Sequence, residues 1–135
     1  MKRLLLGVVA FAITPVAVFG QSPAPSPNPG GMSVDFSWVG TGACSSRSPA
    51  FVVRGVPPGA TVLDFQMMDL NVPSYRHGGG RVAFTGNGNI PQGAFSYVGP
   101  CPPGETHSYQ WTVTALNASG AVLGTATAMR PFPPR

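Results

Sequence analysis

Residues Tyr97 to Leu116 read YVGPCPPGETHSYQWTVTAL, and this stretch joins a rigid turn to an alternating segment. The turn carries three prolines and Cys101. Because proline fixes the backbone φ angle and lacks an N–H donor, the turn is stiff and stays outside any sheet. The second half alternates polar residues with apolar ones, which are Tyr109, Trp111, Val113 and Ala115. A period of two predicts a half-buried β-strand over residues 107–116.

Six other segments carry strand signals, and clusters of glycine and proline separate them. These segments are Ser33 to Gly40, Phe51 to Gly55, Thr61 to Asp69, Arg81 to Gly86, Gly93 to Gly99 and Ala121 to Met129. Outside the N-terminal region, no window shows the apolar stripe of a helix. Seven short strands at this spacing predict an all-β fold, an antiparallel β-sandwich, with a small barrel as the alternative.

The N-terminal sequence MKRLLLGVVAFAITPVAVFGQS has the features of a secretory signal. Lys2 and Arg3 precede an apolar run, and Val18 and Gly20 suit a signal-peptidase site. The run is shorter than the roughly 18 to 20 residues that a membrane span needs, and Pro15 interrupts it. This favours a cleaved signal peptide at residues 1–20 over an uncleaved membrane anchor. We therefore predict a secreted protein of the bacterial periplasm.

The next segment, QSPAPSPNPGG at residues 21–31, is rich in proline and serine and lacks any apolar period. This composition predicts an extended linker. The folded domain is then expected over residues 32–135, a length that suits one small domain with a modest core.

Charge argues against a nucleic-acid partner. Removal of residues 1–20 leaves six arginines against four acidic residues, a net charge of +2. These arginines are scattered along the chain and form no dense basic stripe of the kind that DNA or RNA binding needs.

The two cysteines, Cys44 and Cys101, predict a disulfide. An exported chain meets oxidising conditions, in which an even pair of thiols normally joins. The alternatives are two free buried thiols or half of a metal site. Neither cysteine has a partner at CxxC spacing, which argues against zinc.

Two blocks of the sequence, RSPAFVVRGVPPGATVLDFQMMD and YVGPCPPGETHSYQWTVTAL, resemble the phosphatidylethanolamine-binding protein family. The similarity is to its bacterial, Raf kinase inhibitor-like branch, and the chain resembles a short and divergent form of that branch. The resemblance extends from about Met32 to Thr127. In the second block the matching residues are Tyr97, Gly99, Pro100, Pro102, Pro103, Gly104, His107, Tyr109 and Leu116.

The resemblance implies a β-sandwich with a small pocket at one end, which accepts phosphate-like head groups or similar anions. Members of the family are usually binding proteins, so we expect no enzyme activity and no cofactor. The implied ligand-binding residues are Asp69, His77, Gly99, Pro100, His107 and Tyr109. Possible ligands include a membrane-lipid head group, and some relatives are described as kinase or protease inhibitors.

The spacing of His107 and Tyr109 supports such a pocket. Residues two apart in a strand project from the same face, and an imidazole N–H beside a phenol O–H forms a donor pair suited to an anion. Binding would then strengthen as the pH falls toward 6 and histidine gains its proton. The alternative is a histidine that caps the strand and a tyrosine that packs in the core.

The sequence departs from the family pattern after Asp69. Where the family has an aspartate-proline-aspartate turn, this chain has Leu70 and Asn71, so a neutral amide replaces the second pocket carboxylate. His77 takes the place of the family histidine, but the glycines at 78–80 follow it instead of a tryptophan and a β-branched strand. The alternative role for His77 is a solvent-facing loop residue, and the glycine run is expected to be a loop with positive φ angles.

Other classes of function remain open from the residues. A hydrolase would combine Asp69 and His77 with a serine such as Ser74 or Ser96, although no G-x-S-x-G motif is present. A metal site would combine Asp69, His77 and His107. A protein-interaction or inhibitor module with a degenerate pocket is the remaining alternative.

Overall fold

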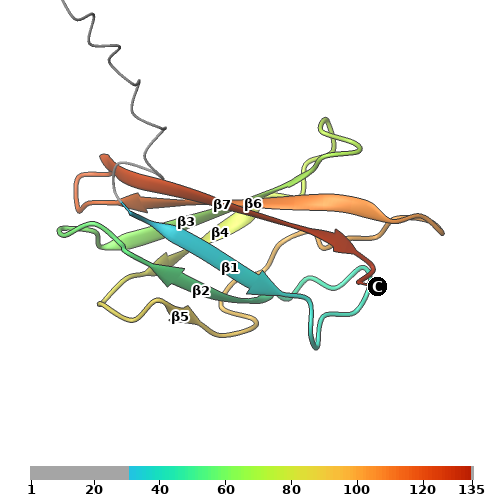
Figure 1. The fold of residues 1–135 in the computed structure, drawn as a ribbon, viewed down its shortest axis with the longest axis horizontal. Coiled ribbons are helices and arrows are strands. Elements are labelled where there is room, and N and C mark those ends of the chain that lie inside the picture. The colour runs from blue at the N-terminus through green and yellow to red at the C-terminus, as the bar shows by residue number, and fades with distance from the viewer. Residues whose placement is uncertain (1–30, 135) are drawn as a thin grey trace, which may run out of the picture.

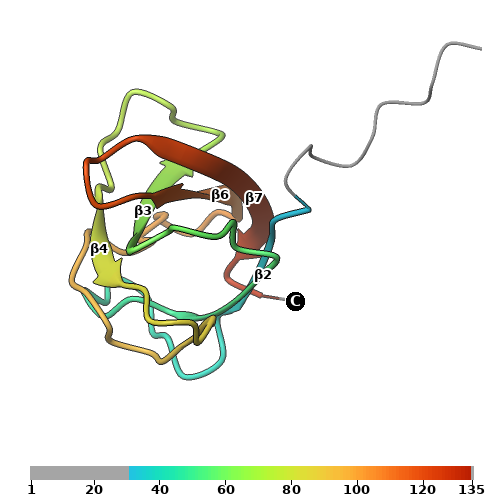
Figure 2. The same cartoon turned by 90° about the vertical axis from the view of Figure 1, so that its left-hand side faces the viewer.

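The computed structural model describes residues 31–134, and these form seven β-strands in two antiparallel sheets that face each other (Figures 1 and 2). The strands are β1 (Ser33–Ser37), β2 (Ala50–Arg54), β3 (Val62–Asp69), β4 (Gly79–Ala83), β5 (Asn89–Ile90), β6 (His107–Leu116) and β7 (Val122–Phe132). One sheet has the order β1-β2-β5 and the other has the order β4-β3-β6-β7. The predicted antiparallel β-sandwich is confirmed.

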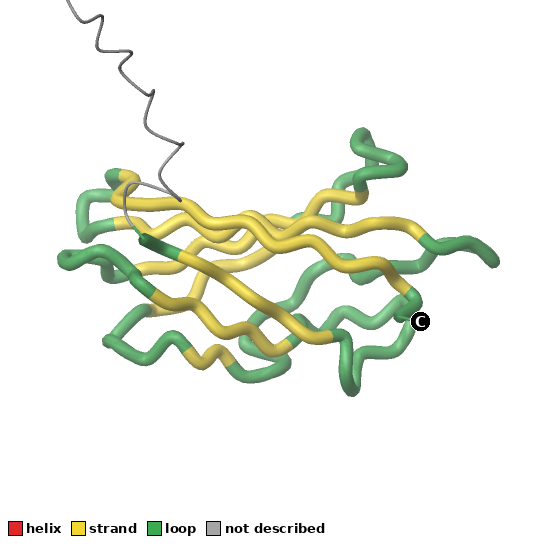
Figure 3. The backbone as a smooth tube through the Cα atoms, in the orientation of Figure 1, coloured by secondary structure: helices red, strands yellow, loops and turns green. Residues whose placement is uncertain are grey.

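The described part of the chain consists of strands and loops (Figure 3). No helix within residues 31–134 is long and apolar enough to cross a membrane. The predicted signal peptide and all but the last residue of the predicted linker lie outside the described residues.

Strands β3 and β6 lie at the centre of the larger sheet, and their register places the ends of both strands together. The pairing runs from Val62 opposite Leu116 to Asp69 opposite Tyr109. On the other side of β6, His107 is opposite Phe132 of β7. Through this register the last residue of β3 meets the first residues of β6, although the two lie far apart in the sequence.

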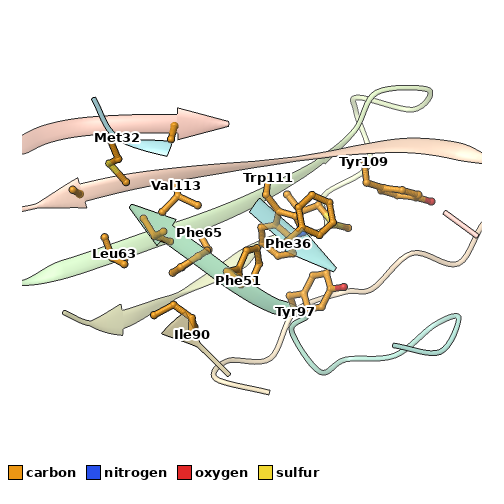
Figure 4. Packing of buried hydrophobic residues seen from close by; sticks show 14 of the residues in the cluster. Met32, Phe36, Phe51, Leu63, Phe65, Ile90, Tyr97, Tyr109, Trp111 and Val113 are labelled. Atoms are coloured by element: carbon orange, nitrogen blue, oxygen red, sulfur yellow. The ribbon is translucent and has the colours of Figure 1, made fainter. Parts of the chain in front are cut away.

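The core lies between the two sheets and follows the alternation of the sequence. Phe65 of β3 and Trp111 of β6 are fully buried, and Phe51 of β2 packs against both from the opposite sheet (Figure 4). The Phe51 and Trp111 rings meet edge to face, with centroids 5.1 Å apart, which is a favoured geometry for aromatic pairs. The intervening residues of β3 and β6 face outward, as the period of two predicts.

One predicted strand is wrong. Gly93 to Gly99 is not a strand of either sheet; Asn89–Ile90 completes the smaller sheet instead. Gly93 has a φ of +80°, which interrupts an extended conformation, and the segment pairs with the loop before β2. The amide of Ser48 donates to the carbonyl of Phe95 at 3.1 Å, and Tyr97 donates to Ser46 at 3.0 Å. The backbone of residues 93–99 therefore pairs with the loop before β2 and not with a strand.

The glycine run also differs from the expectation of a loop. Only Gly78 has a positive φ, of +70°, whereas Gly79 and Gly80 belong to β4. A side chain at Gly79 would collide with the carbonyl of Phe65, and one at Gly80 would collide with the Phe95 ring. These two glycines are explained by close packing against β3 and against the segment that carries Phe95. The strand consequently begins before the predicted Arg81.

The predicted disulfide between Cys44 and Cys101 is present. It joins the loop after β1 to the turn before β6, across 57 residues of sequence. Beside it, the amide of Cys44 donates to the carbonyl of Pro100 at 2.7 Å. The proline-rich turn is thus attached to the rest of the domain by a covalent bond and a backbone hydrogen bond.

Candidate functional site

A cavity of about 350 Å³ opens at the end of the sandwich where β3 ends and β6 begins. Three segments meet there: the β3–β4 loop, the proline-rich turn and the first residues of β6. The lining residues are Asp69, Val72, Tyr75, His77, Gly99, Cys101, Pro102, Pro103, His107 and Tyr109. The structure therefore brings together five of the six residues predicted to bind a ligand.

Asp69 is a buried carboxylate that three donors hold in place. Its Oδ2 atom is 2.6 Å from Nδ1 of His107, and its Oδ1 atom accepts the backbone N–H groups of Asn71 at 2.8 Å and Val72 at 3.1 Å. Burial acts to raise the pKa of Asp69, but the hydrogen bonds from His107 and from the two amides outweigh it and lower the pKa below its ordinary value. Asp69 is therefore an ionised group with a fixed orientation.

His107 makes contact with a carboxylate at each ring nitrogen. Its Nδ1 atom bonds Asp69, and its Nε2 atom lies 3.1 Å from Oε2 of Glu105. Since an ionised carboxylate only accepts, both nitrogens act as donors. The bond to Asp69 first, and then the bond to Glu105, raise the pKa of His107 above its ordinary value of 6.5. The ring is thereby stabilised as an imidazolium cation.

His77 presents the opposite chemistry. The residue is buried, and its Nδ1 atom is 2.6 Å from the carbonyl oxygen of Val98, so Nδ1 carries the proton and donates. Its Nε2 atom is buried and has no hydrogen-bond partner among the described residues. The alternative of a solvent-facing loop residue is therefore wrong for His77. A ligand in the cavity could satisfy this nitrogen.

Tyr109 packs between the two histidines. Its ring is stacked on that of His107, with centroids 6.2 Å apart, and meets that of His77 edge to face at 5.5 Å. Tyr109 sits at the edge of the core cluster, beyond Trp111 (Figure 4). Burial, and then the negative charge of Asp69, raise its pKa to about 12, so the phenol keeps its proton at physiological pH.

The turn forms one wall of the cavity. Gly99 lines it, and any larger residue there would collide with the carbonyl of Ser45. Pro100 does not line the cavity; it is buried behind the wall, where its carbonyl accepts the N–H of Cys44. Pro100 thus supports the wall and does not contact the cavity, which corrects the prediction for this residue.

Asn71 is the residue at which the family pattern has a second aspartate. It does not line the cavity; its side-chain oxygen accepts the N–H of Ser108 at 2.8 Å, and its own N–H donates to Asp69. The amide therefore clamps the start of the β3–β4 loop onto β6, and it leaves Asp69 as the carboxylate of the cavity.

Sequence reasoning missed Val72 and Tyr75, which line the cavity, and Glu105, which contacts His107 but is not among the described residues that line the cavity. Tyr75 precedes His77 by two residues, and their rings lie 4.7 Å apart. Glu105 likewise precedes His107 by two residues, a spacing that could have indicated contact between a carboxylate and an imidazole. No such signal existed for Val72, whose position depends on the path of the loop.

The described residues can also be compared with the two other sites that the sequence left open, a metal site and a hydrolase triad. Among residues 31–134, no three histidine, cysteine or acidic side chains are grouped as metal ligands. Neither Ser74 nor Ser96 is among the described residues that line the cavity.

The comparisons with known proteins show a likeness to solved structures. The sequence matches no protein-family model and no curated protein. The structure is similar to a crystal structure from Chlamydia trachomatis, described as a phosphatidylethanolamine-binding protein homologue, with a TM-score of 0.59 and 18% sequence identity. The match covers 78% of this chain and 99% of that one. This chain therefore has the fold of a phosphatidylethanolamine-binding protein homologue, as the resemblance in its sequence implied.

Proposed function

We propose that this protein binds a small anionic or phosphorylated ligand in the cavity at the end of the sandwich. The observation that carries the proposal is the buried Asp69–His107 pair, with Tyr109 stacked on it, at the wall of a cavity of about 350 Å³. This volume suits a small ligand.

The imidazolium of His107 is the group in the cavity that would attract an anion. No arginine of the described residues lines the cavity, so the imidazolium of His107 is its cationic group. Asp69 orients this ring through Nδ1, and the protonated phenol of Tyr109, which also interacts with Asp69, lies beside it. The side chain of Val72 and the ring of Tyr75 would contact an uncharged part of the same ligand.

We also propose that the protein acts as a binding protein and not as an enzyme, and that it works after export to the periplasm. The first point rests on the resemblance to a family of binding proteins and on the described lining of the cavity, which includes no serine. The second rests on the N-terminal sequence together with the disulfide, because disulfides persist in oxidising compartments.

Calorimetry with phosphate, phosphoethanolamine and acetate tests the function, with His107→Ala as the variant and Thr114→Ala on the outward face of β6 as the control. We expect heat of binding for wild type and the control, and a loss of at least tenfold in affinity for His107→Ala, because a charged hydrogen bond is removed. Stronger binding of phosphoethanolamine than of phosphate would indicate a head group. Equal binding by all three proteins would remove His107 from the site.

The pH dependence of binding provides a second readout. Since the pKa of His107 lies above 6.5, the ring already carries its charge below that value. Affinity for sulfate, whose own charge is constant over this range, should be level at pH 5 to 6 and fall as the pH rises through the raised pKa. The rise in affinity that the sequence placed near pH 6 is thus expected at higher pH.

A further inference from the structure

The two carboxylates that contact His107 differ in how firmly they are held. The Asp69 side chain is 5% exposed and accepts three hydrogen bonds, whereas the Glu105 side chain is 71% exposed and makes one contact, to Nε2 of His107. Glu105 therefore loses little if it rotates into water, because exposed ion pairs contribute little free energy. Asp69 cannot leave without exposing an unpaired charge to the protein interior.

Both N–H groups of His107 are occupied in this arrangement. Asp69 and Glu105 together carry two negative charges against the single positive charge of the ring. An external anion that approaches His107 would therefore meet a site whose net charge is already negative, and it can bond Nε2 only if Glu105 moves away. If an anionic group of the ligand replaces the Glu105 carboxylate on Nε2, the net charge around the ring is almost unchanged.

We infer that Glu105 is an internal competitor of the ligand, whose carboxylate occupies the position of the ligand's anionic group on Nε2 of His107 until the ligand displaces it. This inference rests on the proposed function and adds to it a residue that sets affinity. It also implies selection: a ligand with a single negative charge gains little by the exchange, whereas a phosphate monoester, with higher charge and more acceptor oxygens, gains more.

The position of Glu105 in the chain suits this role. It follows Gly104, whose φ is +66°, in the exposed loop between the disulfide-linked turn and β6. The wall of the cavity is tethered through Cys101, but the Glu105 side chain lies outside that constraint. A rotation of this side chain alone would free Nε2 without any change in the core.

Phosphate titration of Glu105→Gln by calorimetry tests the inference, with Asp35→Asn as the matched control. Asp35 is also an exposed carboxylate, 60% exposed in a single ion pair with Arg130, but it lies on β1 of the other sheet. Both substitutions remove one negative charge. At low ionic strength we expect Glu105→Gln to bind phosphate roughly two- to fivefold more tightly than wild type, and Asp35→Asn to bind as wild type does. Equal tightening in the two variants would reveal a general charge effect and overturn the inference.

A ligand-free measurement separates this inference from the proposed function. NMR titration of the His107 ring should show a lower pKa in Glu105→Gln than in wild type, because one of the two carboxylates is lost. An unchanged pKa would mean that the contact is absent in solution, and it would overturn the inference whatever the ligand. If wild type binds phosphate through His107 and Glu105→Gln binds no better, the internal competitor fails while the binding function stands. If neither protein binds phosphate, both fail.

Discussion

The middle of the paired strands β3 and β6 and one of their ends have opposite chemistry. In the middle of the sandwich their inward-facing residues are apolar, as in Phe65 and Trp111. At the end of the same two strands the inward positions hold Asp69 and His107, which are buried as well. The apolar part holds the sheets together without specific partners, whereas the polar part is stable only because each ionised group has its partner at hydrogen-bond distance. A single register of two strands thus serves both packing and a candidate binding site.

Truncation in the apolar part should have the largest effect on stability. Trp111→Ala leaves a void at a fully buried position, and the free energy of unfolding should fall by about 3 to 5 kcal/mol. Urea unfolding followed by circular dichroism measures this change. Trp111→Phe keeps an aromatic ring and removes an indole N–H that has no hydrogen-bond partner among the described residues, so it should cost clearly less. Equal losses for the two substitutions would show that aromatic packing is not what holds the sheets together.

The disulfide ties the wall of the polar end to the rest of the domain, and its removal should rank next. Replacement of Cys44 and Cys101 by serine frees a loop of 57 residues in the unfolded chain, which corresponds to a loss of about 4 kcal/mol or less. Thermal unfolding of the double variant and of the oxidised wild type gives the comparison. A melting temperature that is unchanged would mean that the backbone contacts between the Cys44 loop and Pro100 are enough to hold the turn.

The smallest expected effect is on how the free energy of unfolding depends on pH through Asp69 and His107, the pair at the polar end of the strands. The lowered pKa of Asp69 contributes stability above its ordinary value of 3.8, and this contribution is lost as the pH falls through the folded-state pKa. The raised pKa of His107 contributes stability that is complete below 6.5 and is lost as the pH rises through the folded-state pKa. Stability from the pair is therefore greatest between these limits.

Asp69→Asn tests this dependence. The variant removes the main cause of the raised pKa of His107, so its free energy of unfolding should decline less than that of wild type when the pH rises above 6.5. Urea unfolding at several pH values from 5 to 9 measures the slopes. Parallel curves for the two proteins would contradict a charged contact between Asp69 and His107. Asp35→Asn again serves as the control for charge alone.

Much of the fold could be predicted from local pattern. The period of two in residues 62–69 and 107–116 identified β3 and β6 with their buried faces, because side chains in a strand alternate by geometry. The same reasoning failed for Gly93 to Gly99. Its composition resembles that of a strand, but the positive φ of Gly93 and the bonds to Ser46 and Ser48 are decided by a loop about fifty residues earlier.

The candidate site likewise contains some residues that the sequence indicated and others whose positions it did not predict. The sequence indicated Asp69, His107 and Tyr109 through a resemblance and through spacing, and these side chains do share one cavity. It did not place Pro100 behind the wall, turn Asn71 away from the cavity or put Glu105 on His107. Each of these depends on the path of a loop, for which proline and glycine content indicates stiffness but not direction.

By itself, the sequence determined that the domain is an antiparallel β-sandwich, that Cys44 pairs with Cys101, and that an imidazole and a phenol project from one face of a strand. Only the tertiary structure decided which protons these groups hold. His77 and His107 are the same residue type, but one donates to a carbonyl and leaves a nitrogen unpartnered, while the other lies between two carboxylates. Alternation is a property of neighbours along the chain, whereas charge at a site depends on groups that the register of the sheet brings together from distant positions.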